Sequence, residues 1–175
     1  RGRIGNTISA SDHASFQHRD LSTGSNLNYA ILQTASGGTQ INSSSGQSLF
    51  INIGNSQAIK VDSDKIITME NQPAFLVTKS GAQDNLSTDT TVTITFDSEI
   101  FDQNSDFSSN TFTAPVTGRY YLQFRLNLGS TDQDTSNFQA QIAASNRTFS
   151  FNFDHGALDQ DAANHTMNGS TLMDM

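Results

Sequence analysis

The sequence predicts an all-β protein, and three observations support this fold class. The 175 residues include 12 Phe but only two Glu and three Lys, and strands favour aromatic and β-branched residues, whereas helices favour residues such as Glu and Lys. Runs rich in these residues recur every roughly 8 to 11 positions between small polar turns, which is typical of all-β architecture. Only 15% of the residues are charged, so the composition is that of an ordered chain with packed layers and not of a disordered one.

The first 70 residues form the N-terminal part of the predicted fold, a series of short strands. The expected strands lie at residues 3–9, 28–33, 39–42, 48–53, 57–62 and 65–69. Small polar stretches at residues 35–38, 43–46 and 54–55 separate them, and the Gly-Gly and Gly-Asn pairs among these suit tight hairpin turns. Residues 11–22 remain open between a short helix capped by Ser11 or Asp12 and an irregular loop.

The apolar content of this region is low for a domain that stands alone. Each strand contributes two or three inward apolar side chains, as in residues 48–53, and small domains of this kind are marginally stable. Such domains usually gain stability by sharing a core between several chains. We therefore expect residues 1–70 to form an oligomeric, β-rich fibre shaft.

A boundary is expected at residues 69–75, where polar residues lead into Pro73. Beyond it the expected strands are longer and more aromatic, at residues 74–79, 91–96, 111–116, 119–128, 138–144 and 147–153. Polar loops connect them, so residues 71–175 are predicted to form a two-sheet β-sandwich or jelly roll. The stretch at 111–126 carries an internal break, and we predict a corner at Pro115 and a bulge or positive φ at Gly118.

The order of motifs in residues 73–126 resembles the globular head of complement C1q, the C1q/TNF-like jelly roll. The resemblance rests on "PAFLVTK", "VTITFDSEIFDQNSDF" and "NTFTAPVTGRYYLQFRL". Its signature positions are Phe96, Asp97, Phe112, Thr113, Ala114, Pro115 and Gly118, followed by Tyr120 and Tyr121. The resemblance implies a jelly-roll head that assembles as a homotrimer. Past residue 128 the match fades, and the Gly-Asp pair that precedes the last strands in this family does not occur, so the head is expected to lack its C-terminal strands.

Residues 15–64 are similar to shaft segments of tail fibres from marine and cyanobacterial phages, and to fibre-like proteins of their hosts. A shaft followed by a C1q-like head implies a viral tail or head fibre, with a homotrimer, other virion or fibre proteins and a host-surface receptor as partners. The expected receptor is a glycan, with a protein receptor as the other possibility. A bacterial extracellular fibre or matrix subunit at the cell surface is the alternative. The chain opens at Arg1 and ends at Met175 without terminal signals, so we expect both ends to be cuts in a longer polypeptide.

Candidate metal ligands are the Asp-x-Asp pairs in predicted loops. Besides Asp62 and Asp64, these are Asp132 with Asp134 and Asp159 with Asp161. Two carboxylates so spaced can reach one calcium ion, and some C1q-like heads bind calcium. The alternative is favoured about three to one: Asp at these positions accepts turn geometry and bonds its own backbone. His155 and His165 are expected to stand alone, and no Cys is present to complete a zinc site.

The tyrosine-rich strand should present two different faces. Tyr121, together with Leu126, is expected to differ in environment from Tyr120, Leu122 and Phe124. One face would fill the sandwich, and the other would face a trimer axis, where tyrosine hydroxyls suit a partly wet interface. A purely intra-chain role for Tyr120, Tyr121 and Phe124 is equally favoured.

The charge and motifs exclude several functional classes. The net charge is −8 without a basic cluster, which disfavours nucleic-acid binding. No apolar run approaches the roughly 20 residues of a membrane span. No nucleophile elbow, phosphate-binding loop or dinucleotide fingerprint occurs. We therefore predict a non-enzymatic structural and adhesion protein, with a surface-polysaccharide depolymerase built on paired carboxylates as the enzymatic alternative.

Overall fold

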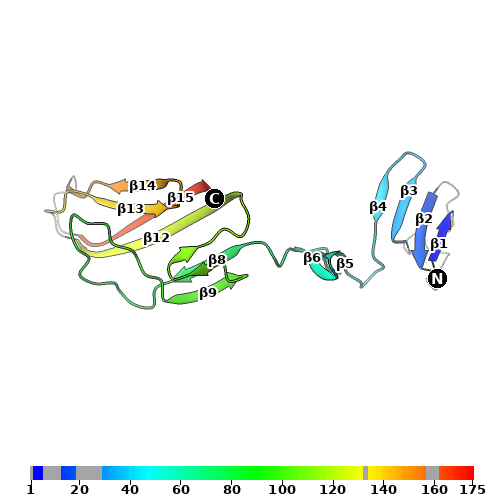
Figure 1. Cartoon of the computed structure of the whole chain (residues 1–175), viewed down its shortest axis with the longest axis horizontal. Helices are drawn as coiled ribbons and strands as arrows, with labels where there is room; N and C mark the ends of the chain where they lie inside the picture. The colour runs from blue at the N-terminus through cyan, green and yellow to red at the C-terminus, as the bar shows by residue number, and fades with distance from the viewer. Residues whose placement is uncertain (1, 6–12, 19–28, 132–133, 157–161) are drawn as a thin grey trace. The chain divides into compact units, whose positions relative to one another are not determined.

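The computed structural model describes residues 2–5, 13–18, 29–131, 134–156 and 162–175, and these residues form an all-β protein without a helix. The chain divides into two compact units, Arg1–Ala74 and Phe75–Met175 (Figure 1). Every strand ladder with a defined register is antiparallel, and the strands group into several small sheets. The predicted all-β class is therefore confirmed, whereas a closed jelly roll is not formed by the ladders of the described residues.

The first unit contains a four-stranded and a three-stranded sheet. The four-stranded sheet runs β1 (Gly2–Gly5), β2 (His13–His18), β3 (Ile31–Thr34) and β4 (Thr39–Ile41), and the three-stranded sheet runs β5 (Leu49–Ile53), β6 (Ser56–Val61) and β7 (Ile67–Thr68). Each of these sheets has its strands in chain order, so neighbouring strands in the sheet are also consecutive in the sequence.

The hairpin turns follow the predicted turn chemistry. Gly54 and Asn55 link β5 to β6, and both have positive φ, at 57° and 66°. This is the requirement of a two-residue type I′ turn, whose twist matches that of the flanking strands. Between β3 and β4, Gly37 also has positive φ, and the Thr34 hydroxyl accepts a hydrogen bond from the Gly38 N–H at 3.0 Å.

The segment that the sequence left open between helix and loop contains a strand instead. His13–His18 forms β2, which pairs with β1 on one side and with β3 on the other. The rest of that segment lies outside the described residues. Two neighbouring strands offer its backbone a ladder on both sides, and this outweighs a weak local capping signal.

The second unit is built around one long antiparallel pair. Its strands are β8 (Ala74–Thr78), β9 (Ser98–Gln103), β10 (Phe107–Ser108), β11 (Thr111–Phe112), β12 (Arg119–Thr131), β13 (Phe138–Ala143), β14 (Thr148–Phe153) and β15 (Ala162–Asp174). β12 pairs with β15 in register from Arg119↔Asp174 to Thr131↔Ala162. Residues 162–174 were not among the predicted strands, yet they form β15, which is as long as β12.

From Arg119 to Leu128 the side chains of β12 alternate between an exposed and a half-buried face. Tyr120, Leu122 and Phe124 are half-buried, whereas Tyr121 is 64% exposed, so the predicted difference between the faces is confirmed. Leu126 was placed with Tyr121, and this is wrong: the period of two puts it on the inner face. On the same face, β15 contributes the buried Met167 and Met173, the in-register partners of Leu126 and Tyr120.

The β13–β14 hairpin covers part of that inner face and lies beside the β12–β15 pair in Figure 1. The rings of Phe124 and Phe151 meet edge to face with centroids 5.1 Å apart. Gly169 lies between them, because a Cβ built there would stand 2.6 Å from Phe151 and 2.7 Å from Phe124. The packing of the two sheets therefore requires glycine at this position.

A second aromatic cluster anchors the shorter strands to the start of β12. Phe75 on β8 stacks on Phe107 and Phe112 at 5.0 and 5.1 Å, and Phe112 meets Tyr120 at 5.3 Å. Phe96 joins the cluster through an edge contact with Phe107. These half-buried rings add to the buried Ala140, Met167 and Met173 in forming the apolar interior of this unit.

Residues 91–96 were predicted to be a strand, and this is wrong. They alternate between half-buried and exposed side chains as a strand does, but they join no ladder, and β9 begins only at Ser98. The reason is that side chains occupy their backbone groups. Gln83 bonds Thr93 and Thr95, and the Asn110 side chain accepts a hydrogen bond from the Phe96 N–H.

The break in residues 110–126 is partly as predicted. β11 ends at Phe112, the chain bends at residues 115–118, and β12 begins at Arg119, so the corner at Pro115 is confirmed. The prediction of a bulge or a positive φ at Gly118 is wrong, because Gly118 has no positive φ and pairs regularly with the opposite strand. Instead, Gly118 exchanges two backbone hydrogen bonds with Met175, at 2.8 and 3.0 Å, and continues the β12–β15 ladder by one residue.

Candidate functional site

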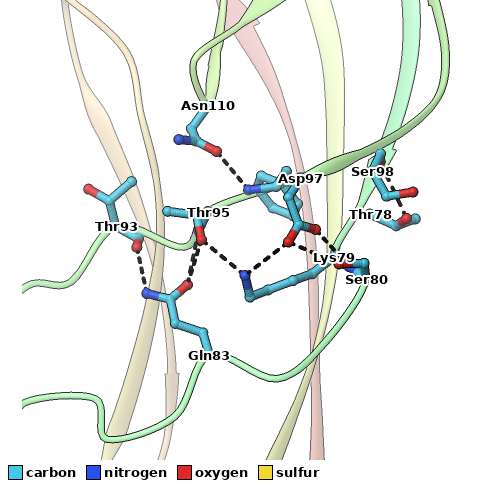
Figure 2. A network of polar contacts seen from close by, with 10 residues as sticks. Thr78, Lys79, Ser80, Gln83, Thr93, Thr95, Asp97, Ser98 and Asn110 are labelled. Carbon is cyan, nitrogen blue, oxygen red and sulfur yellow. Dashed lines mark hydrogen bonds and ion pairs between the residues drawn. The ribbon is translucent and has the colours of Figure 1, made fainter.

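Asp97 is the centre of a polar network between the end of β8 and the extended segment before β9 (Figure 2). Its carboxylate accepts hydrogen bonds from the Ser80 backbone N–H at 2.7 Å and from the Ser80 hydroxyl at 3.0 Å. Lys79 lies 3.6 Å from the same carboxylate and donates to the Thr95 hydroxyl at 3.2 Å. The network therefore fastens two backbone segments that share no ladder hydrogen bonds at this point.

The pKa of the Asp97 carboxyl is lowered from its ordinary value. The Ser80 backbone N–H is the main cause, followed by the Ser80 hydroxyl, and the positive charge of Lys79 adds to them. All three favour the charged form. The carboxylate thus stays ionised and accepts hydrogen bonds, as expected of a group that holds two backbone segments together.

The residues from Phe112 to Tyr120, together with Phe96, are also held by contacts within the chain. Phe96 and Phe112 belong to the aromatic cluster, and the Thr113 N–H bonds the Asp106 carbonyl at 2.7 Å. Ala114 and Pro115 lie at the bend before β12. The Tyr120 hydroxyl closes this bend by donating to the Val116 carbonyl at 2.6 Å. These residues position β12 and leave its outward face for contact with other molecules.

That outward face is the candidate functional site, and we call it the β12–β15 outer face. In-register partners across an antiparallel pair lie on the same side of a sheet. The outer face therefore carries five exposed residues of β12 and their five partners on β15: Arg119, Tyr121, Gln123, Arg125 and Asn127 with Asp174, Leu172, Ser170, Asn168 and Thr166. Amide and hydroxyl side chains dominate it, and they both donate and accept hydrogen bonds.

One end of the outer face is hollowed. A depression of about 380 Å³ is lined by Arg119, Arg147, Leu172 and Asp174. Arg147, which precedes β14, reaches across to form an ion pair with Asp174 at 2.9 Å. Asn146 supports this arrangement by donating to the Asp174 carbonyl at 3.0 Å. Tyr121 and Leu172 are in register next to the depression, and each is 64% exposed.

Of the residues of this site, only Tyr121 was predicted from the sequence as a site residue. Arg147 and Asp174 are 27 positions apart, and no local pattern relates them. The β12 residues could have been found from the alternation of "RYYLQFRLN", since Arg119, Tyr121 and Arg125 share one parity. The pairing with β15 could not, because β15 itself was not foreseen.

The expectation that His155 and His165 stand alone is wrong. The Nδ1 of His155 and the Nε2 of His165 lie 2.9 Å apart, and Phe138 and Phe153 surround the two rings. His155 is fully buried, and its Nε2 has no hydrogen-bond partner among the described residues. Neutral imidazoles share such a bond as one donor and one acceptor.

The proposed calcium ligands lie mostly outside the described residues: of Asp132, Asp134, Asp159 and Asp161, only Asp134 is described, and it is exposed in a turn. Asp62 forms the turn that the alternative predicted, since its Oδ1 accepts hydrogen bonds from the N–H groups of Asp64 and Ile66, both at 2.9 Å. No group of three or more potential metal ligands occurs in the part of the chain that the structure describes.

Compared with known proteins, the chain matches no family model, no curated protein and no solved structure. None of the described residues form a helix that is long and apolar enough to cross a membrane.

Proposed function

We propose that the chain is part of a homotrimeric adhesion fibre, in which residues 1–70 form the shaft and residues 71–175 form a C1q-like head that binds a glycan on a host surface. The resemblance of the signature from Phe96 to Tyr121, preceded by a fibre-like repeat of short strands, makes a viral tail fibre the favoured setting. The jelly-roll assignment rests on the order of these motifs and on the alternating faces of β12.

The observation that carries the proposal is the exposure of the three-stranded sheet in the first unit. Phe50 and Ile51 are consecutive on β5 and so point to opposite faces of the sheet, yet each is about half exposed. Ile53 and Ile67 are 74% and 64% exposed. A soluble sheet normally covers at least one apolar face, and further copies of the same strands would cover these.

A trimer would also explain how weak glycan contacts can hold a fibre on a surface. The β12–β15 outer face is mostly polar, and a single polar face of this kind binds sugars weakly. Three heads on one shaft convert the second and third contacts into intramolecular events, which raises the overall affinity by about 10² to 10⁴.

Two measurements test the proposal. Light scattering after gel filtration should give three times the mass of one chain, because the shaft sheets need partners. Labelled trimer should attach to host cells, and mild periodate oxidation of the cell-surface sugars should abolish attachment. A monomer would contradict the shared shaft, and attachment that survives periodate would contradict the glycan receptor. A fall in the size of purified surface polysaccharide on incubation would favour a depolymerase instead.

A further inference from the structure

We propose that the depression at the end of the β12–β15 outer face binds a carboxylate-bearing sugar of an acidic glycan, with Arg119 as the principal contact. This inference rests on the proposed glycan-binding function and specifies the chemical class of the glycan. The positions of Arg119, Arg125 and Arg147, none of which was predicted as a site residue, support this inference.

The basic residues of the second unit are concentrated on this face. Residues 75–175 contain twelve Asp or Glu but only four Lys or Arg, namely Lys79, Arg119, Arg125 and Arg147. Three of these four lie on or beside the outer face. In a unit with a threefold excess of acidic residues, this clustering gives one face a local positive charge that attracts anions.

Two of the three arginines are unpaired. Within the described parts of the chain, the ion pairs are Lys79 with Asp97 and Arg147 with Asp174, and neither Arg119 nor Arg125 takes part in one. Arg119 is directly opposite Asp174 in the ladder, but Asp174 bonds Arg147. The guanidinium group of Arg119 is therefore free for a ligand at the rim of the depression.

The chemistry of the depression fits a carboxylate. A guanidinium group presents parallel N–H donors that match the two oxygens of a carboxylate. Arg147 already binds one carboxylate, that of Asp174, at 2.9 Å. The two arginines and one aspartate leave a single net positive charge, which suits one carboxylate better than a densely sulfated group.

The neighbouring side chains fit a sugar ring. Tyr121 and Leu172 form an exposed apolar pair beside the depression, against which the C–H face of a sugar can pack. Beyond this pair, Gln123 and Ser170 provide donors and acceptors for hydroxyl groups. Arg125 follows six residues along β12, about 20 Å from Arg119 at the usual strand rise of ~3.3 Å per residue. A chain of several acidic sugars would reach both arginines.

A protein partner fits this face less well. The buried centres of protein interfaces are depleted of charged residues and enriched in aromatic and apolar ones. The outer face has only one aromatic and one large aliphatic side chain among its ten residues, and it has charged groups at both strands. A polar ligand rich in hydroxyl groups is the better match.

The test uses the full chain and three probes of stated chemistry: oligogalacturonate, its methyl ester and dextran sulfate. The ester keeps the sugar backbone and removes the charge. We expect binding to oligogalacturonate, measured by calorimetry at low ionic strength, and at least about tenfold weaker binding to the ester, the ratio that one lost charge-assisted contact gives.

The variants Arg119→Gln and Arg147→Gln should each weaken oligogalacturonate binding about tenfold. The control Lys65→Gln removes the same charge from an exposed turn in the first unit, and its affinity should stay within about twofold of wild type. Arg119 is exposed and forms no ion pair, so its variant should keep the thermal midpoint of wild type.

Equal binding of the acid and the ester, or wild-type affinity of Arg119→Gln, would overturn the acidic specificity and leave a neutral glycan as the ligand of the proposed fibre. Preference for dextran sulfate over oligogalacturonate would overturn the carboxylate assignment. Failure to bind any of the three probes would overturn the inference, while periodate-sensitive attachment of the trimer to cells would still support the proposed function.

Discussion

At the scale of single residues, the two glycines on the β12–β15 pair have opposite roles. Gly169 has two aromatic rings within 2.7 Å of where its Cβ would be, whereas the nearest atom to a Cβ at Gly118 is 3.6 Å away. The sequence singled out Gly118 and not Gly169. A local motif can mark a turn glycine, but it cannot reveal a glycine required by rings on two other strands.

We expect Gly169→Ala to destabilise the second unit by about 1–3 kcal/mol, the usual cost of inserting a methyl group into a packed core. Phe124 and Phe151 would both have to shift. Urea unfolding measures the change. Gly118→Ala is the matched control and should change the free energy of unfolding by no more than about 0.5 kcal/mol. Equal costs for the two variants would contradict this packing.

The residues between Phe96 and Tyr120 illustrate how far the sequence alone predicted contacts at this scale. Phe96, Phe112 and Tyr120 were recognised from a pattern, and the structure places all three in one aromatic cluster. Asp97 was recognised in the same way, but its partners Ser80 and Lys79 were not. Their contact depends on the chain returning over 17 residues, which no short motif encodes.

At the scale of elements, side-chain hydrogen bonds replace a strand ladder in residues 91–97. Gln83 and Asn110 hold this segment from either side, and Asp97 fastens its end to Ser80. The strand prediction used alternation alone. Alternation reports which face is covered, but a strand also needs a neighbouring backbone that is free to pair, and here side chains take its place.

The lowered pKa of Asp97 makes this attachment sensitive to pH. Because the folded protein binds fewer protons at this group than the unfolded chain, the carboxylate stabilises the fold above its unfolded-state pKa of about 4, and the contribution is lost as the pH falls through the lower folded-state pKa. We expect Asp97→Asn to be less stable than wild type near neutral pH.

The stability difference between wild type and Asp97→Asn should shrink as the pH falls below about 4. Thermal unfolding across this range measures it. Asp84→Asn is a suitable control, since Asp84 is an exposed carboxylate that is not among the residues of the network. If the stability difference between wild type and Asp97→Asn stays constant down to strongly acidic pH, the ionised Asp97 carboxylate does not stabilise the fold.

β15 is the element that the sequence analysis missed. Its residues Ala162–Asp174 include small and polar side chains and only three large aliphatic ones, Met167, Leu172 and Met173. Strand propensity there is weak. The strand forms because β12, which has strong propensity and alternating apolar residues, offers it a complete ladder.

At the scale of the whole molecule, the exposed apolar residues of the three-stranded sheet are the reason to expect that several chains assemble through this sheet. Residue Ile53 is 74% exposed, so a charge there costs little in a single chain. In a shared shaft the same charge would be buried without a partner, which is strongly unfavourable.

We therefore expect Ile53→Asp to shift the trimer toward smaller species, measured by light scattering on dilution. Asn55→Asp adds the same charge in the exposed turn that follows β5, outside the two sheet faces, and separates an effect of net charge from one of burial. If neither variant alters the mass, the sheet is not part of the contact between chains.

The sequence by itself determined the all-β class, the hairpin turns at Gly37 and Gly54, the corner at Pro115 and the two faces of β12. These depend on backbone conformations and a period of two, which residue types encode locally. Only the tertiary structure decided the β12–β15 pair, the depression between Arg119 and Arg147, the need for Gly169 and the contact between His155 and His165. Each of these joins residues distant in the chain, and which distant residues meet is decided by the packing of the folded chain as a whole.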